Sequence, residues 1–150
     1  MRKLIIGLAL AAGCRSAAPM AATSARPAGS VTGAATETAA IGQFMAAVKA
    51  EDLQALGAVW GDRDGPARER ISMDQWQKRE LIMLCYLKHD SFKILSDAPS
   101  LDGNRVFAVE VRFGAIVHTG QFVIVHARNG RYYVQDIPDL QQFEDVCATK

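Results

Sequence analysis

Apolar residues recur at helical spacing between residues 37 and 89. Between residues 41 and 48 they follow the i, i+3, i+4, i+7 pattern of an amphipathic helix. Ser72 and Gln75 form a capping-box pattern, which indicates the start of another helix. The apolar run 81–87 predicts that the centre of that helix is the most buried helical segment. The pattern therefore predicts three helices, over 37–50, 53–60 and 72–89.

From residue 92 onward, apolar and polar positions alternate, which is typical of strands. Gly114-Ala115 suits a two-residue hairpin turn, and Asn129-Gly130 is a strong hairpin signal. Asp97–Asn104 contains a proline and an Asp-Gly pair and predicts a loop. The predicted strands cover 92–94, 105–113, 116–126 and 131–137. The expected fold class is α+β, with three N-terminal helices packed on a curved four-stranded antiparallel sheet.

The two turns set a strand register. A turn at 114–115 pairs Phe113 with Ile116, and a turn at 129–130 pairs His126 with Tyr133. The face expected against the helices then holds Phe107, Val109, Val111, Phe113, Phe122, Ile124, Tyr133 and Ile137. The opposite, outer face holds Val106, Ala108, Val123, Val125 and Val134. That face is too aliphatic for a fully solvated surface, which favours a homodimer through the outer sheet face.

The N-terminus has the layout of a secretory signal peptide. Two cations, Arg2 and Lys3, precede an apolar run over 4–10 and the small residues 11–13. A membrane-spanning anchor would need about 20 apolar residues, and this run is shorter. Cys14 follows the small residues directly, which resembles the lipobox of bacterial lipoproteins, although Ala11 stands where that motif most often has Leu.

The lipobox resemblance implies a signal peptide over 1–13 and lipidation of Cys14. It further implies anchoring to a bacterial membrane, on the periplasmic or extracellular side of the cell envelope. The alternative is an ordinary secretory peptide with an accidental cysteine at position 14. Residues 14–36 are then expected to form the lipidated cysteine and a flexible linker, because 15–36 are dominated by Ala, Ser, Thr, Gly and Pro.

Charge separates the leader from the expected folded domain, residues 37–150. The leader adds two cations, whereas residues 37–150 carry 13 basic and 16 acidic side chains. Such a domain lacks the basic surface that proteins use to bind a phosphate backbone. We therefore expect no nucleic-acid partner.

Two helices over 44–60 and the final strand Gly-Arg-Tyr-Tyr-Val at 130–134 resemble the nuclear transport factor 2-like, or cystatin-like, α+β cone. The resemblance covers about 37–137 and rests on patterns. The expected departure from many members is that no strand pair separates the second and third helices. The fold family includes enzymes, ligand-binding proteins and dimerisation modules, so the resemblance leaves function open.

Two functions stay open at this stage. The first is a non-catalytic lipoprotein that binds a small ligand or a protein partner. The second is a proton-transfer enzyme of the isomerase or dehydratase type, which the family resemblance implies would use a polar group inside the cone. His118 and Gln135 point inward in the predicted register and are the candidate ligand-binding residues, with His118 the candidate base; no catalytic residue is assigned. If Trp60, Trp76 and Phe122 fill the cone, both small-molecule hypotheses fail and a structural or interaction role remains.

Metal and cofactor sites are not expected. His118 and His126 lie eight residues apart on one strand, about 26 Å, which is too far to share one ion. Cys85 and His89 have i, i+4 spacing but lack two further ligands.

Cys85 and Cys147 remain once Cys14 is lipidated, and an oxidising compartment favours their pairing. A disulfide would fasten the C-terminal segment to the third helix. The alternative is two unpaired thiols.

Overall fold

The computed structural model describes residues 32–148, which fold as α+β. Three helices precede a four-stranded antiparallel sheet of order β3-β4-β5-β6, and a short helix follows it. The helices are α1 (Glu37–Ala50), α2 (Leu53–Val59), α3 (Met73–Leu87) and α4 (Glu144–Ala148). The strands of the sheet are β3 (Ser91–Pro99), β4 (Arg105–Phe113), β5 (Ile116–His126) and β6 (Tyr132–Asp136). The predicted helices before the sheet and the antiparallel sheet are confirmed.

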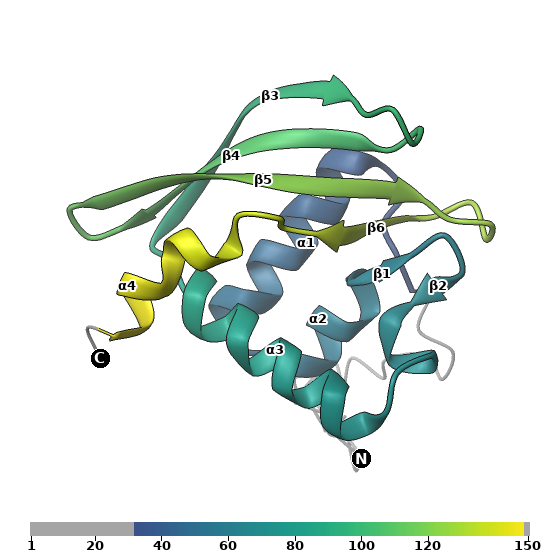
Figure 1. Ribbon diagram of the computed structural model, residues 1–150, viewed down its shortest axis with the longest axis horizontal. Coiled ribbons are helices and arrows are strands. Elements are labelled where there is room, and N and C mark those ends of the chain that lie inside the picture. Colours follow the sequence, from purple (N-terminus) through teal and green to yellow (C-terminus); the bar gives the residue numbers. More distant parts are fainter. Residues whose placement is uncertain (1–31, 149–150) are drawn as a thin grey trace, which may run out of the picture.

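The core lies between one face of the sheet and the helices (Figure 1). Phe44 of α1 and Phe122 of β5 are fully buried, and their rings meet edge to face with centroids 6.1 Å apart. Burial of each such ring stabilises the fold by about 2–3 kcal/mol. Contacts of this kind hold α1 directly against the sheet.

Side chains at the helix starts explain where the helices begin. Thr36 Oγ1 accepts a hydrogen bond from Ala39 N at 3.2 Å, and Ser72 Oγ accepts one from Gln75 N at 3.4 Å. Asp52 caps α2 in the same way, through Ala55 N at 2.9 Å. These oxygens satisfy amide groups that have no partner within their own helix.

The prediction for the centre of α3 is wrong. Leu81 and Ile82 are 56% and 46% exposed, whereas α1 buries Phe44 and Met45 completely. The positions of the two helices explain the difference. Helix α1 lies between the sheet and the other helices, whereas α3 is packed on one side only and α4 covers no more than its end (Figure 1). The apolar run of α3 therefore contributes exposed side chains, Leu81 and Ile82, as well as buried ones, Met83 and Leu87.

Four further expectations are corrected. A two-stranded antiparallel hairpin does separate α2 from α3, formed by β1 (Gly61–Asp62) and β2 (Gly65–Pro66). The predicted loop at 97–104 is shorter, because Asp97, Ala98 and Pro99 pair with β4. The helices are not confined to the N-terminal half, since α4 follows the sheet. The last residues of the predicted linker are also packed on the fold, because Ala34 is buried and bonds to Tyr132 on β6.

The predicted register is confirmed between β4 and β5 and is wrong by one residue at the start of β6. Phe113 pairs with Ile116 and Phe107 with Phe122, as expected. His126, however, pairs with Tyr132. Ala127 N bonds to Arg131 O, so the turn holds three residues, with Gly130 in the left-handed region at φ +74°.

The shift exchanges two side chains between the faces of the sheet. Val134 joins the main core, whereas Tyr133 packs with Val125 and Ala127 on the other side. The Tyr133 hydroxyl bonds to Thr32 Oγ1 at 2.9 Å and accepts a hydrogen bond from Asn129 Nδ2 at 2.8 Å. An irregularity between the partners of Val123 and Ile124 then restores the predicted pairing frame, with Val123 opposite Asp136.

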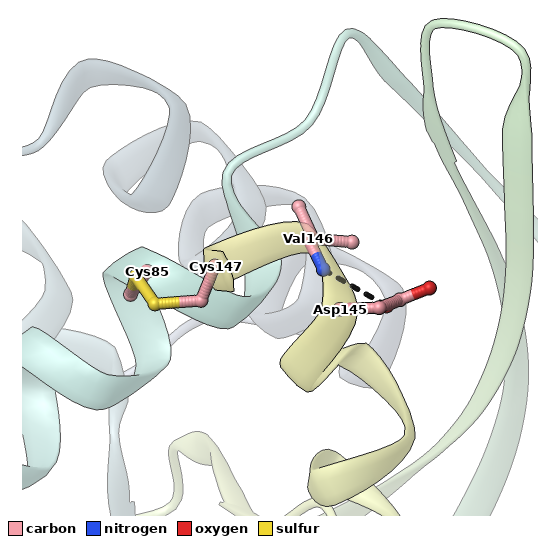
Figure 2. Close-up of a disulfide and its surroundings, with 4 residues drawn as sticks. All are labelled: Cys85, Asp145, Val146 and Cys147. Atoms are coloured by element: carbon pink, nitrogen blue, oxygen red, sulfur yellow. Dashed lines mark hydrogen bonds between the residues drawn. A yellow bond between two sulfur atoms is a disulfide. The ribbon is translucent and has the colours of Figure 1, made fainter. Parts of the chain in front are cut away.

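The C-terminal segment crosses from the sheet to α3. It contains the 3-10 helix η2 (Leu140–Phe143) followed by α4. Phe143 is fully buried against Gly120, where a Cβ atom would lie 2.8 Å from its ring. Figure 2 shows the end of this segment, where Cys147 is joined to Cys85 by a disulfide with 5.2 Å between the Cα atoms.

The predicted signal peptide, Cys14 and most of the predicted linker lie outside the described residues. Within residues 32–148, no helix combines the length and apolar character needed to cross a bilayer.

Candidate functional site

His118 lies at one end of the inner sheet face, under the C-terminal segment. Its ring contacts the rings of Phe113 and Phe143, with centroids 6.1 and 5.4 Å away. Its Nε2 atom is 3.2 Å from both carboxylate oxygens of Asp145. The imidazole is therefore partly covered by two aromatic rings and a carboxylate of the same domain.

Gln135 lies elsewhere. It occupies the irregular position of β6, its residue is exposed, and its Oε1 accepts a hydrogen bond from Asn104 Nδ2 at 2.9 Å. Along β5, the position opposite Gln135 is about five residues, or about 17 Å, from His118. The structure does not bring the two candidate residues into one site.

Aromatic side chains fill the space between the helices and the sheet. Trp60, Trp76 and Phe122 are 8%, 4% and 0% exposed and belong to one core cluster. The interior of the fold is therefore packed, which is the condition that counts against a ligand or substrate inside the cone. Any ligand site has to lie on the flank of the fold.

The candidate for such a site is a groove between α3 and β6, which we call the α3–β6 groove. One of its two hollows has a volume of about 260 Å³ and apolar walls from Trp60, Ile82, Met83, Val134, Ile137 and Leu140. Arg79, Gln135 and Asp136 complete its lining. A second hollow of about 480 Å³ shares Trp60, Arg79, Gln135 and Asp136 with the first and adds Asp62 and Arg70, so the two are continuous. Gln135 is the one sequence-predicted residue that lines the groove.

The charged residues of the groove differ in how they are satisfied. Asp62 and Arg70 form an ion pair with each other. Asp136 Oδ1 accepts a hydrogen bond from Ile137 N at 2.9 Å. Arg79 makes no ion pair or hydrogen bond with any residue of the described chain. It is therefore the unmatched cation of the groove.

Glu80, the neighbour of Arg79, is fully buried against α2. Among residues 32–148, neither of its carboxylate oxygens has a hydrogen-bond partner, and the same is true of the indole nitrogen of Trp76 one turn earlier. Both side chains press on Gly57 of α2, where a Cβ atom would lie 2.7 Å from the Trp76 ring and 3.0 Å from Glu80 Oε1. Burial raises the pKa of Glu80 to about 8, and the Arg68 guanidinium offsets part of that rise.

The sequence did not predict Glu80, Arg79 or Ile82 as site residues. A signal for Glu80 was present, because Trp76, Met83 and Leu87 lie at helical spacing from it and are all buried. For Arg79 and Ile82 no comparable signal existed, since their role depends on β6, which is distant in the sequence.

No cluster of three or more potential metal-ligating residues occurs in the part of the chain that the structure describes. Cys85 is bonded to Cys147, and His89 donates its Nδ1 proton to Leu87 O at 2.8 Å, so the two residues have other partners. Burial also lowers the pKa of His89.

In comparisons with protein-family models, with curated proteins and with solved structures, the chain gives no match. Its function is therefore argued from the sequence and the groove.

Proposed function

We propose that this protein is a lipid-anchored protein of the bacterial cell envelope, and that its folded part is a non-catalytic module that binds a small apolar molecule in the α3–β6 groove. The observation that carries the proposal is the groove itself: an apolar cavity of about 260 Å³ beside a fully packed interior. Its volume is slightly below the range of about 300–1,000 Å³ that is typical of small-molecule sites, so a small ligand is expected. We also propose that the fold belongs to the nuclear transport factor 2-like family.

Two observations support the compartment. The first is the order of cations, apolar run, small residues and Cys14 at the N-terminus. The second is the disulfide between Cys85 and Cys147, because structural disulfides persist mainly in exported proteins. Mass spectrometry of the membrane-extracted protein should find a mature N-terminus at Cys14 with attached acyl chains. An unmodified Cys14 would refute the lipid anchor.

Binding in the groove is tested with N-phenyl-1-naphthylamine, a neutral apolar dye that fluoresces on entering an apolar site. The full chain carrying Cys14→Ser removes the lipid as a competing site. Ile82→Glu places a carboxylate in the groove wall and should weaken dye binding at least tenfold. Leu81→Glu is the matched control, because Leu81 is exposed on the same helix and does not line the groove. Equal loss in both variants, or in neither, would refute the groove as the binding site.

Proton transfer at His118 has less support. His118 does not line the α3–β6 groove, and Asp145 and two aromatic rings occupy its surroundings. A substrate would first have to displace the C-terminal segment.

A homodimer through the outer sheet face is the proposed mode of self-association. That face has a shallow hollow of about 440 Å³, lined in part by Leu101, Val106 and Ala108, and Leu101 is fully exposed. Sedimentation velocity should show a dimer that Ala108→Lys converts to a monomer. A monomer at all concentrations before substitution would refute the dimer.

A further inference from the structure

We infer that the α3–β6 groove selects a small apolar molecule that carries a single negative charge, and that Arg79 recognises that charge. This inference rests on the proposed function, because it specifies the ligand of the same groove. It follows from an inventory of the charges around an otherwise apolar cavity.

Arg79 lies beside the apolar wall of the groove. It lines both hollows of the groove, and Ile82, three residues later on α3, forms part of the wall. Residues with i, i+3 spacing are neighbours on one helix face. The guanidinium group offers five N–H donors in a planar fork, which matches a carboxylate or a sulfonate.

The other charges of the groove do not neutralise Arg79. Asp62 is paired with Arg70, so their charges cancel locally. Asp136 also lines both hollows but forms no ion pair among residues 32–148. Its carboxylate is held by a backbone N–H and stays in the lining, where it repels a second negative charge on a ligand. Arg79 can bind one negative charge, and Asp136 in the same lining disfavours a second, so the groove favours a monoanion.

The apolar walls of the groove determine the second property of the ligand, its hydrocarbon part. Trp60, Met83 and Leu140 present an indole ring, a thioether chain and an aliphatic chain to the cavity. Burial of a hydrocarbon group against such walls favours binding. A small inorganic anion would leave these walls in water, so the predicted ligand is amphipathic.

The test uses two dyes that differ in one group. 8-Anilinonaphthalene-1-sulfonate carries a sulfonate, and N-phenyl-1-naphthylamine is its neutral parent. Both are titrated into the full chain with Cys14→Ser, with and without Arg79→Gln. We expect Arg79→Gln to weaken the sulfonate dye about tenfold and to change the neutral dye less than twofold.

Matched variants separate a specific contact from a general charge effect. Lys78→Gln removes the adjacent positive charge on α3; Lys78 pairs with Asp74 and does not line the groove, so both dyes should bind unchanged. Asp136→Asn should tighten the sulfonate dye about twofold, because it removes a repulsive charge.

The outcomes distinguish this inference from the proposed function. If Ile82→Glu abolishes binding of the neutral dye but Arg79→Gln leaves the ratio of the two affinities unchanged, the groove binds apolar molecules and the anionic specificity is refuted. If Lys78→Gln weakens the sulfonate dye as much as Arg79→Gln, the effect is general electrostatics and the inference fails. If neither dye depends on Ile82, the proposed function fails as well. A circular dichroism spectrum shows that each variant is folded.

Discussion

Replacement of Glu80 by glutamine should remove a pH dependence from the stability of the fold. The glutamine side chain has the shape of the neutral acid and does not ionise. Glu80 is fully buried, with both oxygens unpaired, and the pKa of its carboxyl group is raised from 4.5 to about 8. The folded protein therefore keeps a proton that the unfolded chain loses.

The sign of the effect follows from proton binding. Between pH 4.5 and about 8 the folded state binds more protons at this position than the unfolded state, so stability falls as the pH rises. The fall is about 1.4 kcal/mol per pH unit and reaches about 5 kcal/mol as an upper limit. Below pH 4.5 both states are protonated, and the penalty for burying a charge disappears.

Urea unfolding of the full chain, followed by tryptophan fluorescence at pH 5, 6, 7 and 8, measures this slope. We expect the free energy of unfolding of Glu80→Gln to be close to that of the parent at pH 5 and to exceed it by several kcal/mol at pH 8. At each pH the free energy of unfolding of the parent is subtracted from that of the variant, so the contribution of histidine titration, which both proteins share, cancels. Glu69→Gln, an exposed position before α3, is the control and should leave the slope unchanged. Parallel curves for Glu80→Gln and the parent would refute a protonated Glu80 in the folded state.

Three further predictions concern the segments that close the fold. Replacing Cys85 and Cys147 together by serine should lower the free energy of unfolding by about 4 kcal/mol in urea, since the disulfide closes a loop with a sequence separation of 62; unchanged stability would show that the disulfide contributes little. Gly120→Val should cost more than 2 kcal/mol in the same assay, because its side chain meets the Phe143 ring, and a neutral effect would contradict that packing. Tyr133→Phe removes two hydrogen bonds and should cost about 1–3 kcal/mol, with thermal unfolding as the check.

The helices were predictable because their signals are local. Thr36, Asp52 and Ser72 each cap the helix that follows them, and in α1 the apolar spacing also marks the buried face. The β4–β5 hairpin was predictable for the same reason, since Gly114 has the positive φ of 58° that such a tight turn requires. Capping, periodicity and turn chemistry all act within a few residues.

The β5–β6 register was not predictable from its turn residues. Asn129-Gly130 suits a two-residue turn, and a three-residue turn also uses a glycine in the left-handed region. The choice between them depends on which face of β6 is buried. Val134 meets Trp60 in the core, and Tyr133 meets Gly33 and Gly61, which leave room for its ring. These partners lie more than 70 residues away in the sequence.

The amino-acid sequence by itself determined the α+β class, the three helices before the sheet and most of the strands, because these depend on side-chain periodicity and local hydrogen bonding. It also provided the N-terminal pattern on which the proposed lipid anchor depends. Tertiary structure alone decided that Ile82 lines a groove, that Arg79 forms no ion pair among residues 32–148, and that Glu80 is buried against Gly57. The exposure of a side chain, its ion pairs and its pKa all depend on the residues that pack against it. For Ile82, Arg79 and Glu80 those residues are distant in the sequence.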